Sequence, residues 1–323
     1  MGISGKFRPV AAAAAFFFCS LCEAGGGESG DTEWIVKVNG VPIPKAILDR
    51  RLPLALAQIK SIDPSFDPQR DKERVARAEK GLIEEIIKVE VLRQYARERK
   101  LAPPAAVLDE FMKFADADSR ERRGKPLEKF LKDNGESLED FRSFHAARLA
   151  VENEIRSSIT IEEEKRFFEE RKDFLPLRRA AHILIGFKES RKPSHKERSR
   201  EEAKKKAEAI VEKLRKGADL AEIARSESDC PSRENGGDLG FFPRKGHGSP
   251  APEISIATYM LAAPGDTTGV IESDYGFHII KLLEVRGFEQ VEPMVKDMLV
   301  YEKLQDKVEE LLKTARIERQ VKQ

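Results

Sequence analysis

SDCPSRENGGDLGFF, residues 228–242, is the stretch that decides how the rest of the sequence is interpreted. It places a cysteine, Cys230, shortly before a Gly-Gly pair and ends in two phenylalanines. Adjacent glycines are typical of tight turns, because glycine lacks a Cβ and adopts positive φ at little steric cost. We therefore expect residues 236–242 to be rich in turns.

Two strands that carry histidines are expected on either side of this stretch. Residues 180–187, AAHILIGF, form a short apolar run that predicts a buried strand with His182. Residues 277–285, FHIIKLLEV, predict a second strand with His278. Because side chains alternate along a strand, each histidine shares a face with the apolar residue two positions further on.

In their order and spacing, these three segments resemble the parvulin family of peptidyl-prolyl cis-trans isomerases. The resemblance covers residues 175–287 and includes Pro264-Gly265-Asp266, where the family has a turn before its third strand. It implies an α+β fold in which a small antiparallel sheet is wrapped by helices. It also implies the activity of the family, which is isomerisation of the peptide bond before a proline.

The resemblance further implies which residues form the active site. His182 and His278 are expected to meet across adjacent strands and to hydrogen-bond to each other. Cys230 is expected beside the substrate carbonyl, as a polarisable group rather than an attacking one, with Tyr275 near the same carbonyl. The apolar positions expected to line the proline cup are Leu239 and Phe242.

The wall of the proline pocket is where this sequence departs from the family. Parvulins have a Met followed four residues later by a Phe, whereas residues 244–253 here read RKGHGSPAPE. Depending on the alignment, the positions concerned are His247 or Gly248 for the Met, and Ala251 or Pro252 for the Phe. Tyr259 or Met260, from the following segment, could fill part of the gap. We therefore expect a shallow proline cup and weak isomerase activity.

A basic loop, SRKPSHKER at residues 190–198, follows the first strand. It resembles the loop of parvulins that prefer a phosphorylated or acidic residue before proline. Arg191 and Lys192 match the paired cations of that loop, but a further lysine of the family is replaced by Gly186. We expect an acidic residue as the ligand, because the N-terminus described next predicts export, and exported proteins rarely meet phosphoproteins. The alternative is a solvated, charged loop.

The N-terminus has the pattern of a secretory signal. Two basic residues precede an apolar run at residues 10–22, which is shorter than the roughly 20 residues that span a bilayer. We expect a signal peptide at residues 1–24 and a flexible tether, GGGESGDTE, at residues 25–33. The expected location is therefore the periplasm or cell envelope.

Two other interpretations of the N-terminus remain open. Lipidation of Cys19 or Cys22 would produce a membrane-anchored lipoprotein, and the apolar run could instead form a buried helix. The three glycines at residues 25–27 disfavour that helix. Cleavage after Ala24 would leave Cys230 as the one cysteine of the mature chain, so we expect no internal disulfide.

The flanks of the parvulin-like segment are expected to be mostly helical. Residues 34–43 predict a β-hairpin around Asn39-Gly40, and amphipathic helical patterns follow it. Residues 293–314 predict a final helix. Signal, hairpin, helices, parvulin segment and returning helix together resemble the SurA/PrsA-type foldases. This resemblance implies a helical chaperone domain at residues 34–174, with residues 288–323 packing back on it and the parvulin domain inserted between them.

Composition and spacing disfavour other classes of protein. A formal net charge of +1, with one Trp and four Tyr, provides no basic or stacking surface for nucleic acid. The histidines lack His-x-His or Glu-x-x-His spacing, so we expect neither a metal nor a cofactor. A cysteine hydrolase that uses Cys230 and a histidine is disfavoured, because the sequence has no recognisable oxyanion-hole motif. His145, isolated among helix-forming residues, is interpreted as a surface or core residue.

The sequence therefore predicts an exported foldase that isomerises X-Pro bonds in, and chaperones, unfolded exported or outer-membrane proteins. The alternative is a holding chaperone whose parvulin domain binds chain segments but is weak or inactive. The altered pocket wall favours the alternative, whereas His182, Cys230, Tyr275 and His278 favour isomerase activity. The expected partners are unfolded polypeptides, and the oligomeric state is left open.

Overall fold

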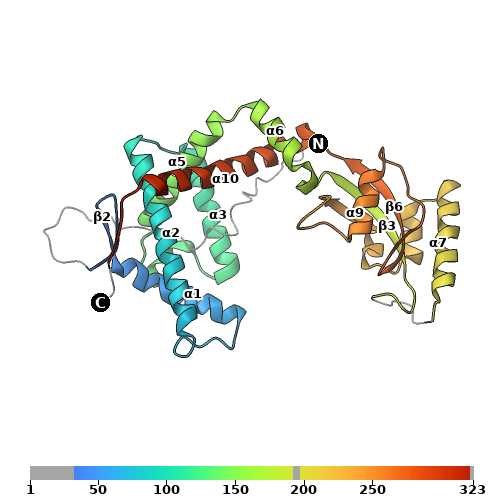
Figure 1. Ribbon diagram of the computed structural model, residues 1–323, viewed down its shortest axis with the longest axis horizontal. Helices are drawn as coiled ribbons and strands as arrows, with labels where there is room; N and C mark the ends of the chain where they lie inside the picture. The colour runs from blue at the N-terminus through green and yellow to red at the C-terminus, as the bar shows by residue number, and fades with distance from the viewer. Residues whose placement is uncertain (1–32, 192–196, 321–323) are drawn as a thin grey trace. The chain divides into compact units, whose positions relative to one another are not determined.

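The computed structural model describes residues 33–191 and 197–320 (Figure 1). The predicted signal peptide, the lipidation candidates Cys19 and Cys22, and Lys192 of the basic loop lie outside these residues, as does all of the predicted tether except Glu33. The described residues divide into two compact units. The first unit comprises residues 33–159 and 296–320, and the second unit comprises residues 160–295. Within the described ranges, no helix is both long and apolar enough to cross a membrane.

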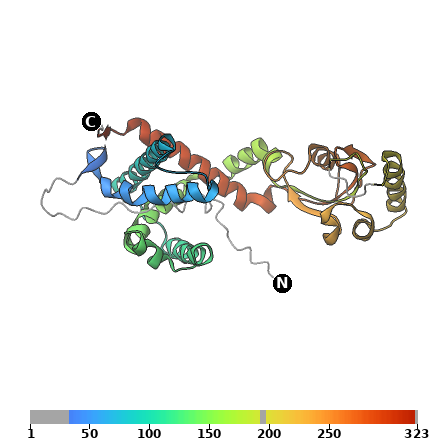
Figure 2. The same cartoon turned by 90° about the horizontal axis from the view of Figure 1, so that it is seen from below.

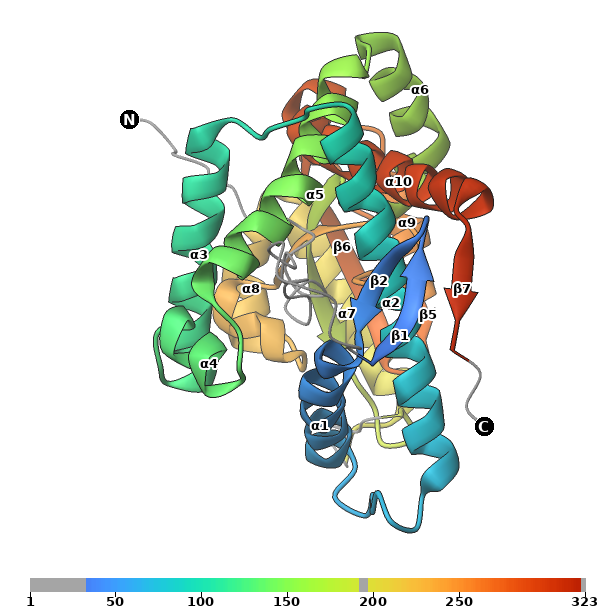
Figure 3. The ribbon, with the colours of Figure 1, turned by 90° about the vertical axis from the view of Figure 1, so that its left-hand side faces the viewer.

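The first unit contains a sheet built from both ends of the described chain. Strands β1 (Trp34–Val38) and β2 (Val41–Pro44) form the predicted hairpin, and β7 (Ile317–Arg319) pairs antiparallel with the other edge of β1 (Figure 3). Asn39 and Gly40 have φ values of 52° and 83°. Positive φ at both turn residues matches the right-handed twist of the strands, which explains why Asn-Gly predicted this turn correctly.

Helices make up the rest of the first unit: α1 (Lys45–Ile62), α2 (Lys72–Glu98), α3 (Ala105–Arg123), α4 (Leu127–Asp133), α5 (Leu138–Ser158) and most of α10 (Phe288–Thr314). One apolar core joins the hairpin, α1, α2 and the end of α10, with Val36, Ile43 and Ile87 fully buried. A second core joins α3, α4 and α5. In α5, His145 is 2% exposed and its ring lies 4.3 Å from that of Phe141, so His145 is a core residue.

A polar network ties the hairpin turn to α2 and β7. The Asn39 side chain donates to Oε1 of Gln94 at 2.8 Å and accepts from the N–H of Arg316 at 2.8 Å. The Gln94 side chain, 8% exposed as a residue, donates in turn to the carbonyl of Val38 at 3.0 Å. Since buried polar groups must be hydrogen-bonded to be tolerated, this network fixes the turn in one place.

The second unit contains a four-stranded antiparallel sheet in the order β4-β3-β6-β5. Its elements in chain order are α6 (Ile161–Arg171), η2 (Lys172–Phe174), β3 (Arg178–Ile185), α7 (Arg200–Arg215), α8 (Leu220–Glu227), η3 (Pro231–Asn235), β4 (Asp238–Phe242), α9 (Pro252–Met260), β5 (Ile271–Ser273) and β6 (Gly276–Val285). The predicted α+β fold class, a small antiparallel sheet with helices within a mostly helical chain, is therefore confirmed.

The two faces of this sheet carry different side chains. On one face, Ile183 and Ile279 pack with α7 and α8, and α7 lies beside the sheet in both views (Figures 1 and 2). On the other face, Ala180 and Ile280 pack with α9. The alternation along β3 and β6 therefore directs the even-numbered residues, including both histidines, to the face that α9 partly covers.

The boundaries of the elements and units differ from those expected in three places. The α9 helix was not predicted, and α10 begins at Phe288, so that Pro293 lies inside the helix rather than at its start. The second unit also includes α6 and the first turns of α10, where the rings of Phe168 and Phe288 lie 5.7 Å apart. The boundary was expected at residue 175, where the composition changes. The contact between Phe168 and Phe288 instead joins α6, which precedes residue 175, to the start of α10.

Candidate functional site

Two buried histidines form the centre of the candidate site. In the register of β3 against β6, His182 pairs with Ile280 and Leu184 pairs with His278, so the histidines are diagonal neighbours on one face. Their Nδ1 atoms lie 3.4 Å apart, and their rings are stacked at 5.5 Å with an interplanar angle of 19°. They are 3% and 1% exposed. The structure therefore brings the predicted pair together.

Ser273 is a third member of this group, and it was not expected from the sequence. Its Oγ lies 2.7 Å from Nε2 of His278 and accepts a hydrogen bond from the N–H of Tyr275 at 3.0 Å. Ser273 pairs with Gly276 across the β5–β6 turn, which places it diagonally opposite His278. The sequence signal that could have predicted its place is SDYGFH, residues 273–278, interpreted as a hairpin with a two-residue turn.

Burial keeps both histidines neutral at neutral pH. Desolvation, and secondarily the neighbouring His278, lowers the pKa of His182 to about 3. Desolvation lowers the pKa of His278 to about 4. Each neutral ring carries one N–H, so the contact between the Nδ1 atoms requires one ring to donate and the other to accept. Nε2 of His182 makes no hydrogen bond to any residue that the structure describes.

An apolar cluster lies on the same face of the sheet as the histidines. Its buried members are Ala180, Phe242, Ile254 and Ile280, and its partly buried members are Leu239, Ala251, Ala257 and Tyr259. The Tyr259 hydroxyl donates to the carbonyl of Phe242 at 3.1 Å, which fixes its ring in the cluster. Burial raises the pKa of this hydroxyl. The expected cup residues Leu239, Phe242 and Tyr259 are therefore brought together.

Two side chains near the expected pocket wall lie differently from the prediction. Met260 is 79% exposed, so its side chain does not fill the gap in the wall. Ile254, on the first turn of α9, is 5% exposed and packs in the apolar cluster, although the sequence did not single it out. The missing Met and Phe are therefore partly replaced by a branched aliphatic side chain from an unpredicted helix.

Cys230 lies at the start of η3, next to β3. It is a free, half-buried cysteine whose N–H donates to Oγ of Ser228 at 3.3 Å. The same Oγ accepts from the N–H of Leu184 at 3.1 Å, two residues after His182. The segment that carries Cys230 is thus attached to the strand that carries the first histidine.

Tyr275 and Arg191 meet at the β5–β6 turn. The N–H of Arg191 donates to the carbonyl of Asp274 at 2.7 Å, and its guanidinium lies 5.7 Å from the centre of the Tyr275 ring. A cation over an aromatic face at this distance is attracted by the ring quadrupole. The start of the basic loop is therefore placed beside the turn that carries Tyr275.

Comparison with known proteins identifies the family. The Rotamase family, described as a PPIC-type PPIASE domain, matches residues 182–284. A relative named foldase protein PrsA, from Geobacillus sp. strain WCH70, is 30% identical over 97% of this chain and 95% of its own length. The chain belongs to the PrsA foldase family. The predicted resemblance and the predicted enzyme class, a parvulin-type peptidyl-prolyl cis-trans isomerase, are confirmed at this level.

Other members of the family match over shorter stretches. The PrsA foldase of Caldanaerobacter subterraneus is 32% identical over 50% of this chain, and the chain spans about half of that protein, 48% of its length. A crystal structure described as peptidylprolyl isomerase (PrsA) from Bacillus anthracis is 25% identical, with a TM-score of 0.32, and the match covers 72% of this chain and 96% of the other.

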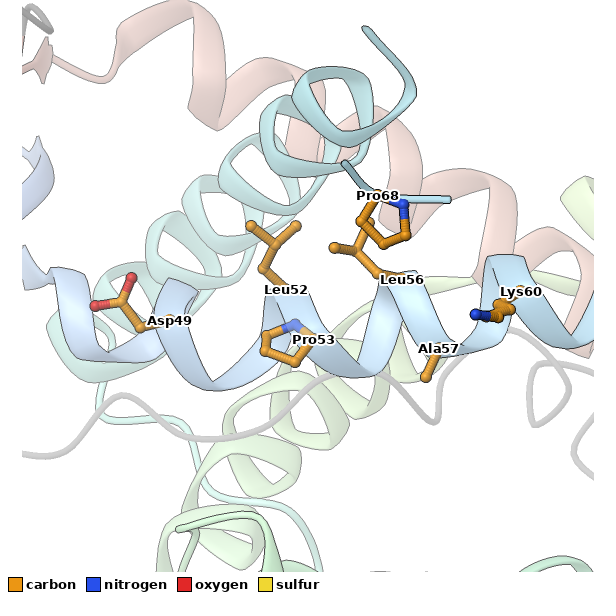
Figure 4. Close-up of a pocket in the computed structure, with 7 residues that line it drawn as sticks. All are labelled: Asp49, Leu52, Pro53, Leu56, Ala57, Lys60 and Pro68. Carbon is orange, nitrogen blue, oxygen red and sulfur yellow. The ribbon is translucent and has the colours of Figure 1, made fainter. Parts of the chain in front are cut away.

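A second candidate feature lies on α1 in the first unit. The buried residues of this helix are Ile47, Leu48 and Arg51, whereas none of residues 52–62 is buried. A pocket of about 450 Å³ lies along this half (Figure 4), lined by Asp49, Leu52, Pro53, Leu56, Ala57, Lys60 and Pro68. Most of its lining is apolar, with one acidic and one basic residue, so it provides a surface for apolar side chains.

Proposed function

We propose that this protein is an exported foldase that isomerises X-Pro bonds in unfolded exported proteins, and that the reaction occurs at the His182–His278 site. The observation that carries the proposal is the neutral, buried histidine pair beside the cluster of Leu239, Phe242 and Tyr259, within a PPIC-type domain. In this proposal Cys230 and Tyr275 lie near the substrate carbonyl.

The chemistry of such a site requires no covalent step. Rotation about a peptide bond has a barrier of about 18–20 kcal/mol, because the twisted amide loses its resonance. X-Pro bonds populate both isomers in unfolded chains and exchange slowly. A site that holds the proline ring in apolar surroundings and binds the twisted amide more tightly than either planar isomer lowers this barrier. A thousandfold acceleration requires about 4 kcal/mol of such differential binding.

A proline-limited refolding assay tests this proposal. We expect the mature chain to accelerate refolding and the His278→Ala variant to lose most of that acceleration. Lys204→Ala is a control, because Lys204 is an exposed residue of α7 in the same unit. Equal acceleration by the wild type and by His278→Ala would show that the isomerase proposal is wrong.

We propose an acidic residue before proline as the preferred substrate of the site. The support is the position of Arg191 beside Tyr275, with Lys192 as a further cation of the same loop. We expect higher kcat/KM for Glu-Pro than for Ala-Pro peptides. If turnover of the two peptides is equal, and unaffected by Arg191→Ala combined with Lys192→Ala, this preference is wrong.

A second function is favoured by the surface of α1. We propose that the first unit holds unfolded polypeptides through the apolar pocket on this helix. Relatives named foldase and chaperone support an unfolded polypeptide as the occupant. We expect Leu56→Asp to weaken suppression of client aggregation, while Gln58→Asp, on the exposed side of the helix, has little effect. If both functions are present, His278→Ala lowers the refolding rate and leaves suppression of aggregation unchanged. The remaining alternative is a holding chaperone without isomerase activity.

Export and anchoring are proposals with a direct test. We propose cleavage after Ala24 and release into the periplasm or cell envelope, supported by the signal-like pattern at residues 1–24. Mass spectrometry of the mature protein is expected to find Gly25 as the first residue. A diacylglyceryl group on Cys19 or Cys22 would instead establish the lipoprotein form.

A further inference from the structure

The last residue of the basic loop, Arg198, forms a partly buried ion pair. Nη1 of Arg198 donates to Oδ2 of Asp229 at 2.6 Å, and the two side chains are 16% and 3% exposed. The same Nη1 donates to the carbonyl of Gly186 at 2.9 Å, and the N–H of Gly186 donates to Oδ2 of Asp229 at 2.8 Å. Charge-assisted hydrogen bonds therefore join the two residues to Gly186, which directly follows β3.

This ion pair connects the loop with two parts of the candidate site. Asp229 directly precedes Cys230, and its N–H donates to the carbonyl of Leu184 in β3 at 2.8 Å. At the loop base, the N–H of Lys188 donates to the carbonyl of Arg198 at 3.0 Å. The early part of the loop is attached to the β5–β6 turn through Arg191. The loop is thus held at one end by the segment of Cys230 and near the other by the turn of Tyr275.

We infer that Arg198 is a positioning residue for substrate selection: paired with Asp229, it fixes the base of the loop so that Arg191 stays at Tyr275. The inference rests on the proposed acidic preference of the site. The Asp229 side chain is 3% exposed, so loss of the Arg198 charge weakens the compensation of its carboxylate and also removes the hydrogen bond from Arg198 to the carbonyl of Gly186. By contrast, the ion pair of Arg200 with Glu272 is 54% and 45% exposed, and a similar change there costs little.

The test compares Arg198→Met, Arg198→Lys and the control Arg200→Met in the full chain. The readouts are the Kd values of Glu-Pro and Ala-Pro peptides, measured by NMR titration, together with kcat/KM for each. For Arg198→Met we expect the preference for Glu-Pro to fall about tenfold, equivalent to ~1.4 kcal/mol, while the Kd of Ala-Pro changes less than about twofold. Arg198→Lys should recover part of the preference, and Arg200→Met should keep it.

The outcomes separate this inference from the proposed isomerase function. Absence of turnover by the wild type would contradict the isomerase function, but peptide binding would still report the role of Arg198. An unchanged Glu-Pro preference in Arg198→Met, an equal loss in Arg200→Met, or a wild type without any preference would overturn the inference. If Arg198→Met does not fold, Arg198→Met combined with Asp229→Asn removes both charges and retains an acceptor for Gly186. Its expected result is the same.

Discussion

At the scale of single residues, the site depends on two histidines that carry no charge. Their depressed pKa values mean that the pair cannot donate a proton as imidazolium near neutral pH. They connect β3 with β6 through one N–H, and in the proposed function this connection holds the floor of the site. The Ser273 hydroxyl continues this connection to the β5–β6 turn.

Replacement of Ser273 should disturb the histidine pair directly. Ser273→Ala removes the partner 2.7 Å from Nε2 of His278, a buried ring nitrogen. We expect a loss of ~1–2 kcal/mol in the free energy of unfolding, because a buried polar atom is left unpaired, together with lower isomerase activity. Chemical denaturation and the refolding assay measure the two effects. Ser232→Ala is the matched control, because the Ser232 hydroxyl has no hydrogen bond within the described residues; an equal loss in both variants would contradict the role of Ser273.

Acid should destabilise the second unit through the same histidines. In the unfolded chain a histidine has a pKa of 6.5, against about 4 for His278 and about 3 for His182 in the fold. Between pH 6.5 and 4 the unfolded state binds protons that the folded state does not. Stability is therefore complete above pH 6.5 and falls on acidification, by up to ~1.4 kcal/mol per pH unit for each histidine.

Calorimetry between pH 7.5 and pH 4.5 checks this dependence on a transition assigned to the second unit. The His278→Asn variant should show a shallower dependence on pH than the wild type. A wild-type slope that matches that of His278→Asn would show that this histidine is not buried in its neutral form.

Some residues of the site could be predicted from the sequence and others could not, for physical reasons. Alternation along the two strands placed His182 and His278 each on a face with apolar neighbours, and their meeting was expected from the resemblance to the parvulin family. Ser273 depends on the register of the β5–β6 hairpin, whose two-residue turn was not predicted. Ile254 depends on α9, where two prolines and small residues obscured a helical pattern. The exposure of Met260 follows from its place in the last turn of that helix.

At the scale of elements, the turns determine whether the strands meet correctly. Gly276 begins β6 with a φ of 135°, and a Cβ at this position would lie 2.5 Å from the carbonyl oxygen of Ile185. No side chain fits there without movement of the adjacent strand. The close approach of β3 and β6 at this point therefore requires glycine.

Gly276→Ala should consequently be much more harmful than the same change nearby. We expect a loss of ~3 kcal/mol or more in the free energy of unfolding, from backbone strain and the clash with Ile185. At Gly269, a Cβ would meet no atom within 4 Å and φ is not positive, so Gly269→Ala is the control. Thermal unfolding of both variants measures the difference, and comparable stabilities would contradict the proposed clash.

Most elements were predictable from their patterns, and the exceptions have identifiable causes. Helix α5 begins where Ser137 caps it, with the Ser137 side chain accepting from the N–H of Asp140. Helix α3 has polar residues in its last turns and continues to Arg123, where Gly124, with a φ of 67°, terminates it. A long polar helix end lacks the apolar periodicity that marks a helix, whereas a glycine cap can be recognised from a single residue.

At the scale of the whole molecule, the two units should respond independently to substitution. Asn39→Ala removes the hydrogen bonds to Gln94 and Arg316 and places alanine at a φ of 52°. We expect the first unit to lose ~2–3 kcal/mol, while peptide isomerisation by the second unit is unchanged. Calorimetry and the peptide assay measure these effects.

The variant Asn39→Gly separates the two causes of that loss. Glycine tolerates positive φ, so the part of the destabilisation that remains in Asn39→Gly reports the hydrogen bonds alone. A loss of isomerase activity in either variant, at a temperature where the second unit is folded, would contradict the independence of the units.

The pairing of β1 with β7 also sets an order of events on a growing chain. Residues 160–295 are continuous, so the second unit has all its residues well before synthesis ends. The first unit must wait for Ile317–Arg319, and until then one edge of β1 has no strand beside it. Sheets that join distant parts of a chain also form slowly. A copy emerging from the ribosome can therefore complete its catalytic unit first, while its own helical unit is still an incompletely folded polypeptide.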